Sequence, residues 1–211
     1  IVRNQMYADA LELCALDQEK FPEVLPCGSI VGTVLPERAK ELRLSEKTVV
    51  LTGAMDQIAS AIGAGNIRQG IITETTGTAL VVGATVATPQ FDLQTPVTVY
   101  KHYNDQFIYM PYFPTAGITL KWFRDTILPY LTDEAKKKGV SSYDLLNDIA
   151  RNSPPGSNGV IMNPDMMNGG AFHGLSLATT LPDLARSVME GVALMLRSLI
   201  ELVESKGLEA D

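Results

Sequence analysis

The sequence predicts an α/β protein with a mixed sheet, and three observations predict it. An apolar run at residues 48–53 is followed directly by a helical pattern at 55–65. Successive strand-like segments then occupy residues 70–112 and are joined by turns. Helical periods return after that block and end in a long amphipathic segment at 180–207. Strands and helices therefore alternate in one part of the chain and are grouped in another.

The composition is that of a globular chain. Its 211 residues suffice for one large domain or two small ones; 45% of them are hydrophobic and 19% charged. The net charge of −7 argues against a nucleic-acid partner, which requires a basic surface. The longest basic run, residues 136–138, precedes Gly139 and is interpreted as the solvated end of a helix rather than an anion-binding patch. No window approaches the roughly eighteen apolar residues of a membrane span, so no membrane partner is expected.

The cysteines and histidines argue against two common kinds of site. Cys14 and Cys27 make no disulfide framework, and reduced thiols favour a cytoplasmic location. His102 and His173 lack the spacing of a histidine zinc site. No metal-ligating residue is predicted in this chain.

Five elements are predicted in the N-terminal third. The spacing of apolar residues predicts a helix over 4–20, and turn residues bound a short strand at 29–34. A first-turn proline opens a helix at 36–44. A buried strand at 48–53 then leads into the small-residue helix at 55–65.

Two strand pairs and a strand follow, with helices between and after them. The strand pairs cover residues 70–86, with a turn near Gly77, and 95–112, with a turn at 104–105. Another strand is predicted at 160–164.

The helices in this part are predicted from period and caps. A helix over 118–131 has one apolar stripe, formed by Leu120, Phe123, Ile127 and Leu131. Ser141 or Ser142 caps a short helix that reaches residue 152. Thr180 caps the long last helix, and Gly207 ends it.

Asp56 is the first candidate for chemistry. It follows an apparently buried strand and opens a helix, and ligands of α/β sheets bind at such junctions. A carboxylate there could take a proton from a substrate hydroxyl, while Gln57 could hold a second hydroxyl. Spacing alone equally allows Asp56 to be a first-turn acid that stabilises the helix.

Two glycine-containing stretches are candidates for binding an anion. In the stretch 74–82, Thr76 and Thr78 bracket Gly77, so backbone N–H groups and hydroxyls could meet a phosphate; an ordinary hairpin has the same residues. Gly117 precedes a helix whose free N–H groups could meet an anion, and Lys121 lies one turn later. A plain amphipathic helix accounts for this second stretch equally well.

These stretches occur in an order that resembles the FGGY carbohydrate kinases, a family with xylulose, ribulose, gluconate and glycerol kinases. The segment 32–65 is similar to the end of the family's first domain. The segment 170–190 fits the family's second signature. The residues that carry this fit are Gly170, Phe172, Gly174, Leu175, Asp183, Leu184, Ser187 and Glu190. The resemblance covers essentially the whole chain.

The resemblance implies a ribonuclease-H-like, actin-like ATPase fold and ATP-dependent phosphorylation of a sugar or polyol, as in xylulose kinases. Asp56 matches the catalytic base, and Gln57 a substrate-contacting position. The positions that contact the ATP phosphates in the family are matched by Thr76, Gly77, Thr78, Gly117 and Lys121. Lys121 departs from the glycerol kinase branch, where glutamine is common. ATP and Mg²⁺ are the implied cofactors, and a homodimer is a family-level expectation.

The resemblance also implies that the chain is an internal piece. Residues 1–66 match the C-terminal part of the sugar-binding domain, and residues 67–211 the first part of the nucleotide-binding domain. Family members are about twice as long or more, as two-domain enzymes usually are. Their N-terminal phosphate and Mg²⁺ motif and their adenine motif do not occur here. The 211-residue piece alone is therefore expected to be inactive.

Two other functions remain open. One is a non-catalytic actin-like or sugar-sensing protein, against which the intact Asp56 and the 76–78 turn argue. The other is a phosphohydrolase of the same superfold, which would use water as the nucleophile. The sequence does not name the sugar.

Overall fold

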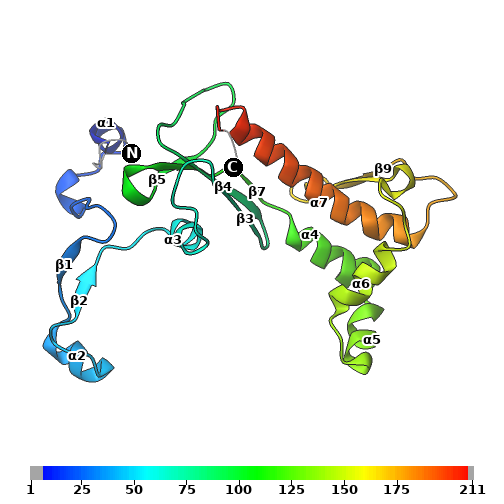
Figure 1. Ribbon diagram of the computed structural model, residues 1–211, viewed down its shortest axis with the longest axis horizontal. Coiled ribbons are helices and arrows are strands. Elements are labelled where there is room, and N and C mark those ends of the chain that lie inside the picture. Colours follow the sequence, from blue (N-terminus) through cyan, green and yellow to red (C-terminus); the bar gives the residue numbers. More distant parts are fainter. Residues whose placement is uncertain (1–6, 209–211) are drawn as a thin grey trace. The chain divides into compact units, whose positions relative to one another are not determined.

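The computed structural model describes residues 7–208 and divides into two compact units, Ile1–Gly65 and Asn66–Asp211 (Figure 1). Helices and strands alternate in the first unit, while strands and then helices follow each other in the second. The predicted α/β class is confirmed. The predicted mixed sheet is wrong for the described residues, since every strand pair there is antiparallel. Parallel pairs need a crossover of a dozen or more residues, whereas most of these strands are joined by shorter turns.

The first unit contains one small sheet and several short helices. Its elements are α1 (Ala8–Leu13), η1 (Gln18–Lys20), β1 (Ile30–Thr33), α2 (Pro36–Leu42), β2 (Val49–Leu51) and α3 (Asp56–Gly63). β1 and β2 pair in antiparallel fashion, with Ile30 opposite Leu51. Except for the first predicted helix, the strands and helices predicted for this unit are confirmed.

The N-terminal helix is shorter than predicted. Residues 4–6 lie outside the described range, and α1 ends at Leu13 because Ala15 adopts a left-handed conformation with φ of 53°. The Asp17 side chain then caps η1 by accepting a hydrogen bond from the Glu19 amide at 3.0 Å. Local cap chemistry therefore breaks the predicted helix into two pieces.

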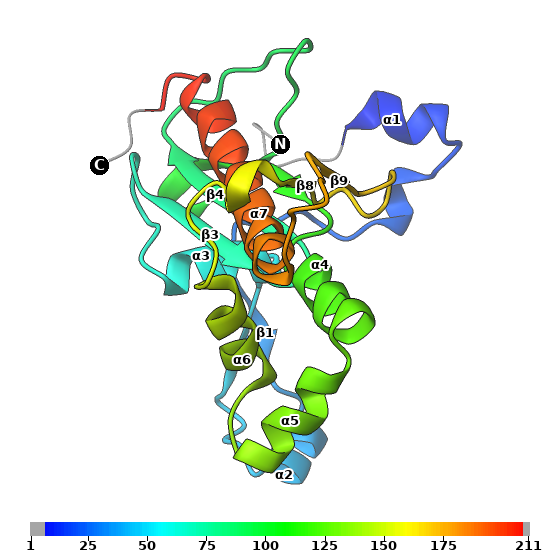
Figure 2. The same ribbon diagram turned by 90° about the vertical axis from the view of Figure 1, so that its right-hand side faces the viewer.

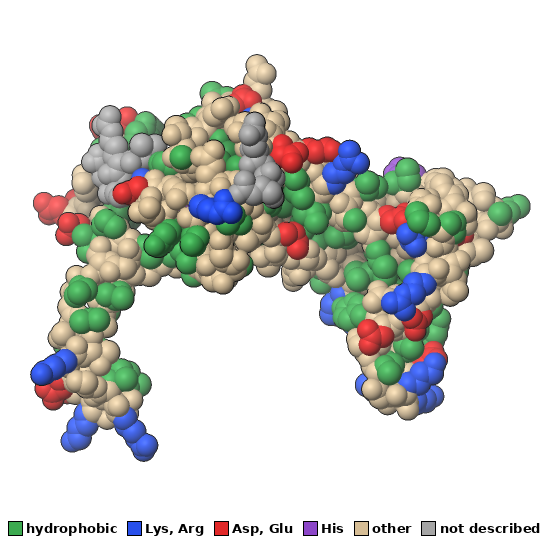
Figure 3. Space-filling model, in the orientation of Figure 1, with side chains coloured by type: hydrophobic (Ala, Val, Ile, Leu, Met, Phe, Trp, Pro, Cys, Tyr) green, Lys and Arg blue, Asp and Glu red, His purple; other side chains and the backbone are tan. Residues whose placement is uncertain are grey.

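The strand β2 is exposed, although its apolar sequence predicts a buried strand. Val50 and Leu51 are 41% and 51% exposed, because β2 pairs with β1 alone in a two-stranded sheet whose residues are all exposed. Figure 3 shows hydrophobic side chains at the surface of this part of the chain.

The second unit is built on an antiparallel sheet. Its strands are β3 (Ile72–Thr76), β4 (Leu80–Val86), β5 (Val99–Lys101), β6 (Phe107–Tyr109) and β7 (Tyr112–Phe113), with η2 (Tyr103–Asp105) between β5 and β6. The strand order is β3-β4-β6-β5, and β7 pairs with the start of β4. Both predicted strand pairs are confirmed, while the two-residue β7 was not predicted. β4 is buried along nearly its whole length and forms the centre of the core.

The helix predicted over 118–131 is interrupted. α4 (Gly117–Trp122) passes into one π-helical turn, η3 (Phe123–Ile127), and α5 (Tyr130–Lys138) begins after Pro129. The Leu128 amide donates to the Phe123 carbonyl at 3.3 Å, five residues back. This extra residue moves the buried stripe by one position, so Leu128 is 2% exposed whereas Ile127 is 43% exposed. The prediction of Ile127 in the stripe is therefore wrong.

The predicted C-terminus after the basic run and the predicted N-terminal cap of the following helix are confirmed, while that helix ends at Ala150, two residues before its predicted end. α5 ends at Lys138, and Gly139 is the left-handed cap residue with φ of 66°. α6 (Ser142–Ala150) begins after Ser141, whose hydroxyl accepts a hydrogen bond from the Tyr143 amide at 3.2 Å. The basic run is thus the last turn of α5.

The final elements are η4 (Ser157–Gly159), the hairpin of β8 (Ile161–Asn163) with β9 (Ala171–His173), and α7 (Leu181–Glu204). The hairpin lies beside the N-terminal part of α7 in both views (Figures 1 and 2). The Thr180 cap is confirmed as a capping box with Asp183, and Gly207 follows the helix end. The C-terminal half of α7 packs Leu199 and Val203 on the sheet. Within residues 7–208, no helix has the length and apolar character needed to cross a membrane.

Gly191 allows α7 to contact the backbone of β8. A Cβ at this position would overlap the carbonyl oxygen of Met162 and lie 3.3 Å from its carbon. We expect Gly191→Ala to lower the free energy of unfolding by about 1–3 kcal/mol, as over-packing does. Urea denaturation measures this. Gly63→Ala is the control, since its Cβ would meet no atom within 4 Å. An unchanged midpoint for Gly191→Ala would contradict the expectation.

Candidate functional site

The turn between β3 and β4 contacts the start of α4. The amides of Ala116 and Gly117 donate to the carbonyl oxygens of Thr78 and Gly77, both at 2.9 Å. A Cβ on Gly117 would overlap the Gly77 oxygen and lie 3.2 Å from its carbon. Only glycine therefore permits this approach. Within the second unit, the structure brings Gly77, Thr78 and Gly117 together.

The donors available at this turn are fewer than the sequence predicts. The Gly77 amide donates to the Ala79 carbonyl and the Gly117 amide to Gly77, so neither is free to meet an anion. The free N–H group expected at Gly117 is therefore absent, because close packing on the turn uses it. Thr78 is an exposed residue, and neither its amide nor its hydroxyl bonds to a residue of the described chain.

Thr76 has a partner that the sequence analysis missed. Its hydroxyl donates to the carboxylate of Glu74, two residues earlier on the exposed edge strand β3. Residues two apart on a strand share a face, so strand period was the available signal. The Thr76 hydroxyl oxygen still has lone pairs, but its proton is engaged.

Lys121 lies one turn after Gly117 on α4, so the two residues share a helix face. Its ammonium pairs with Asp125, which also accepts from the Arg124 guanidinium at 2.6 Å. Hydrogen bonds from Lys121 and then Arg124 lower the pKa of Asp125. Arg124 stacks on the Tyr143 ring, with 4.5 Å from the guanidinium carbon to the ring centroid. Lys121 is therefore a half-exposed, acid-paired cation.

Asp56 and Gln57 belong to the first unit and begin α3. Asp56 is exposed, and its Oδ1 accepts a hydrogen bond from the Gln57 amide at 2.8 Å. Met55 occupies the cap position, so Asp56 is a first-turn acid. Its second carboxylate oxygen bonds to no described residue, so it remains open to a hydroxyl donor.

Two acids of α7 hold a loop that sequence reasoning did not connect with them. Asp183 is 1% exposed and accepts from the Ser153 hydroxyl at 2.6 Å and the Asn158 amide at 2.9 Å. Glu190 accepts from the Gly156 amide at 3.0 Å and the Ser157 hydroxyl at 2.8 Å. These partners lie about thirty residues away in sequence, which is beyond the reach of local patterns.

The loop needs these bonds because its backbone is strained. Ser157 and Asn158 adopt left-handed φ angles of 49° and 51°, between two left-handed glycines. Hydrogen bonds from Ser153, then Thr180, lower the pKa of Asp183 strongly. Burial alone would raise the pKa of Glu190, but hydrogen bonds from Arg186 and Ser157 outweigh it and lower that pKa. Both acids are therefore structural carboxylates.

These shifts predict acid sensitivity. A carboxyl whose pKa is lowered by folding stabilises the fold fully at pH values above its ordinary pKa, which is 3.8 for Asp183. That stabilisation is lost as the pH falls through the lower pKa of the folded state. We expect Asp183→Asn to reduce stability at pH 7 and to flatten its decline in acid, measured as urea midpoints from pH 7 to pH 2. Asp148→Asn removes an exposed pair with Arg151 and serves as the control. Parallel pH profiles for wild type and Asp183→Asn would contradict this.

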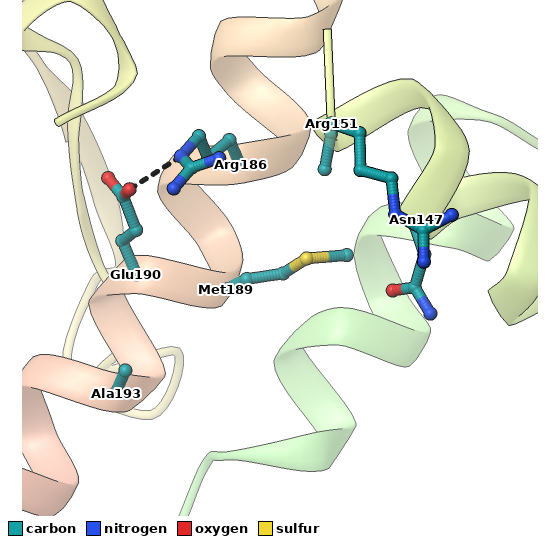
Figure 4. Close-up of a pocket in the computed structure, with 7 residues that line it drawn as sticks. Asn147, Arg151, Arg186, Met189, Glu190 and Ala193 are labelled. Carbon is teal, nitrogen blue, oxygen red and sulfur yellow. Dashed lines mark hydrogen bonds and ion pairs between the residues drawn. The ribbon is translucent and has the colours of Figure 1, made fainter. Parts of the chain in front are cut away.

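A pocket of about 330 Å³ lies between α6 and α7 (Figure 4). Asn147 lines it from α6, Arg151 from the residue that follows α6, and Arg186, Met189 and Glu190 from α7. Arg186 pairs with Glu190 at 2.7 Å, and Arg151 pairs with Asp148 at 2.6 Å. It contains none of the predicted site residues. Among residues 7–208, no group of three or more His, Cys, Asp or Glu side chains could hold a metal ion.

The sequence is similar to curated sugar kinases. It is 26% identical over 196 residues to the gluconokinase of Bacillus subtilis, a match that covers 87% of this chain and 38% of that protein. It is 27% identical over 218 residues to the xylulose kinase of Bacillus subtilis, covering 98% of this chain and 42% of that protein. No family model matches the chain.

The structure is similar to solved sugar kinases. It matches the crystal structure of xylulose kinase from Rhodospirillum rubrum with a TM-score of 0.85 and 26% identity, over 98% of this chain and 42% of that one. The resemblance to the FGGY carbohydrate kinases that the sequence motifs indicate is confirmed by these similarities, and the chain spans about 40% of the length of the relatives that it matches.

Proposed function

We propose that the full-length protein transfers the γ-phosphoryl group of ATP to a hydroxyl of a sugar or polyol, as a xylulose-kinase-like enzyme. The observation that carries this proposal is the contact of the Gly77–Thr78 turn with α4, in which Thr78 is exposed and its amide and hydroxyl are left without a bond to the described chain. The similarity to xylulose and gluconate kinases supports it. Because the chain spans about 40% of these relatives, the isolated 211 residues are expected to be inactive.

The chain would contribute to two domains, and the proposed boundary lies within one residue of the division between the two units. Residues 1–66 would form the end of the sugar-binding domain, and residues 67–211 the first part of the nucleotide-binding domain. Asp56 and Gln57 would then serve the sugar, while Thr76, Gly77, Thr78, Gly117 and Lys121 would serve ATP. A cytoplasmic location and a homodimer remain predictions.

Asp56 would act as the general base. Its free carboxylate oxygen takes the proton of the attacking hydroxyl, while the Gln57 amide holds the other oxygen at 2.8 Å and so fixes the carboxylate. The N-terminus of α3 favours the ionised form, which a base requires. Gln57, half-buried beside it, would hold a second hydroxyl of the sugar.

The residues of the turn suit the phosphates. The Thr78 amide and hydroxyl would donate to phosphate oxygens, and Gly117 would keep the turn in place through its close contact. Lys121 would add a positive charge from the same helix face. Bound ATP with Mg²⁺ would supply the phosphoryl group and offset the charge that develops during transfer. Mg²⁺ commonly keeps several waters and binds substrate phosphates, so the lack of a metal-ligating cluster among residues 7–208 is compatible with it.

A thermal-shift screen tests the proposed substrate class. Full-length protein with a non-hydrolysable ATP analogue is heated with pentuloses, hexuloses, gluconate or glycerol. At about 100 times its Kd, a true substrate adds roughly 2.7 kcal/mol to the free energy of unfolding and raises Tm. No shift with any sugar, despite a shift with the nucleotide, would contradict the proposed substrate class.

A further inference from the structure

Asn66 is the first residue of the second unit and is wholly buried. Its side-chain amide donates to the Gly83 carbonyl at 3.0 Å and the Thr73 hydroxyl at 3.1 Å. Its side-chain oxygen accepts from the Thr85 hydroxyl at 2.5 Å. One side chain thereby ties the beginning of the unit to both β3 and β4.

The hairpin of β5 and β6 holds the same segment through its backbone. His102 Nε2 lies 2.5 Å from the Asn66 carbonyl oxygen, and because a carbonyl only accepts, Nε2 carries the proton. The Gln106 side-chain amide donates to the next carbonyl, that of Ile67, at 3.4 Å. The His102 amide donates to the Gln106 carbonyl at 2.8 Å, so the two side chains leave the hairpin as neighbours. We refer to Asn66, His102 and Gln106 as the junction clamp.

The clamp is retained at a cost. In the described chain, His102 Nδ1 and Gln106 Oε1 are buried without a hydrogen-bond partner. Unpaired buried acceptors lower stability, and an apolar pair of similar shape would avoid this. These two polar side chains do, however, hydrogen-bond to the backbone carbonyls of residues 66 and 67.

On the other side of the junction, the chain is bonded to the first unit. The Ala64 amide donates to the Ser60 carbonyl and the Gly65 amide to the Ile62 carbonyl, both at 2.9 Å. Gly65 is exposed, with φ of 87°, and a Cβ there would meet no atom within 4 Å. The hydrogen bonds that hold this segment to the first unit therefore end at Gly65, and those that hold it to the second unit begin at Asn66.

We infer that Gly65 is the pivot between the two units and that the junction clamp confines bending to it. Two backbone torsions, the ψ of Gly65 and the φ of Asn66, lie between these two sets of hydrogen bonds and are fixed by neither. The clamp keeps a change of orientation from spreading into β3, whose far end leads into the Gly77–Thr78 turn. This inference does not depend on the proposed phosphoryl transfer.

The pivot is tested with Gly65→Ala in the full-length protein. Spin labels on cysteines replacing Arg38 of α2 and Lys137 of α5, with Cys14, Cys27 and any other native cysteine changed to serine, report the distance between the units by pulsed EPR. Alanine disfavours φ of 87° without a clash, so we expect a shifted or narrower distance distribution. Gly139→Ala is the matched control, since Gly139 has φ of 66°, equal free space and no place at the junction. A Gly65→Ala distribution identical to wild type would overturn the pivot.

The clamp is tested with Asn66→Ala and with His102→Leu, which keeps the Asn66 side-chain bonds should the first variant not fold. Amides 67–72 are expected to exchange about tenfold faster, with a broader distance distribution, because local opening becomes easier. Lys206→Met is the control, because it removes a largely buried link to Asp92 and Thr95 elsewhere in the unit. The clamp would be refuted if Lys206→Met, at an equal loss of stability, broadened the distance distribution as much as the clamp variants. It would also be refuted if neither clamp variant broadened that distribution.

Discussion

Replacing Asp56 with asparagine is expected to lower kcat of the full-length kinase by about 10²–10⁴-fold, the range that a general base contributes. Asparagine cannot take the proton of the attacking hydroxyl. Its side-chain oxygen can still accept the bond from the Gln57 amide, now at 2.8 Å, so the start of α3 should persist. Sugar-dependent ADP release at saturating substrates measures kcat, and circular dichroism checks the fold.

Asp17→Asn is the matched control for this variant. Asp17 also accepts a bond from a nearby backbone amide, that of Glu19, at the start of a short helix in the same unit. It has no proposed role, so its kcat should equal that of wild type. If Asp56→Asn kept the wild-type kcat, Asp56 would be only a first-turn acid of α3. If both variants lost the same factor in kcat, the loss would indicate damage to the first unit.

The second large effect is expected for Gly117→Ala. The added methyl group would overlap the Gly77 carbonyl oxygen, so the turn that presents Thr78 must move. Misplacement by about 1 Å can cost roughly 10²-fold, and we expect kcat/KM for ATP to fall by about that factor. The KM for sugar should change little, because its proposed contacts are on α3.

Gly191→Ala is the control that distinguishes displacement of the Gly77–Thr78 turn from a general loss of stability. It too places a methyl group against a backbone carbonyl in the second unit, that of Met162, but it does not touch the turn. Its kcat/KM for ATP should remain near wild type at temperatures where it is folded. An unchanged kcat/KM for ATP in Gly117→Ala would contradict the proposed role of the turn.

Local chemistry made much of the fold predictable. The caps at Ser141 and Thr180 depend on residues within three positions, and both were predicted from sequence. The β3–β4 hairpin follows from two apolar runs around Gly77. The π turn before Leu128 was not predictable, because a helical period assumes a constant number of residues per turn. The inserted residue places Leu128, rather than Ile127, in the buried stripe.

The site was less predictable than the fold. Sequence motifs singled out Gly77, Thr78 and Gly117 separately, and the structure adds that backbone bonds join them. That same contact occupies the Gly117 amide, which no pattern in the sequence reveals. The exposure of β2 is of the same kind, because it depends on what packs against the strand rather than on its own apolar residues.

The most direct test of the proposed function is the product of the reaction. Full-length protein is incubated with ATP, Mg²⁺ and each candidate sugar, and ³¹P NMR follows the phosphorus atoms. The account predicts a sugar phosphate that forms in step with ADP, only when a sugar is present, and that is lost in Asp56→Asn. ADP and inorganic phosphate formed at the same rate without sugar, and no sugar phosphate with any candidate, would contradict it.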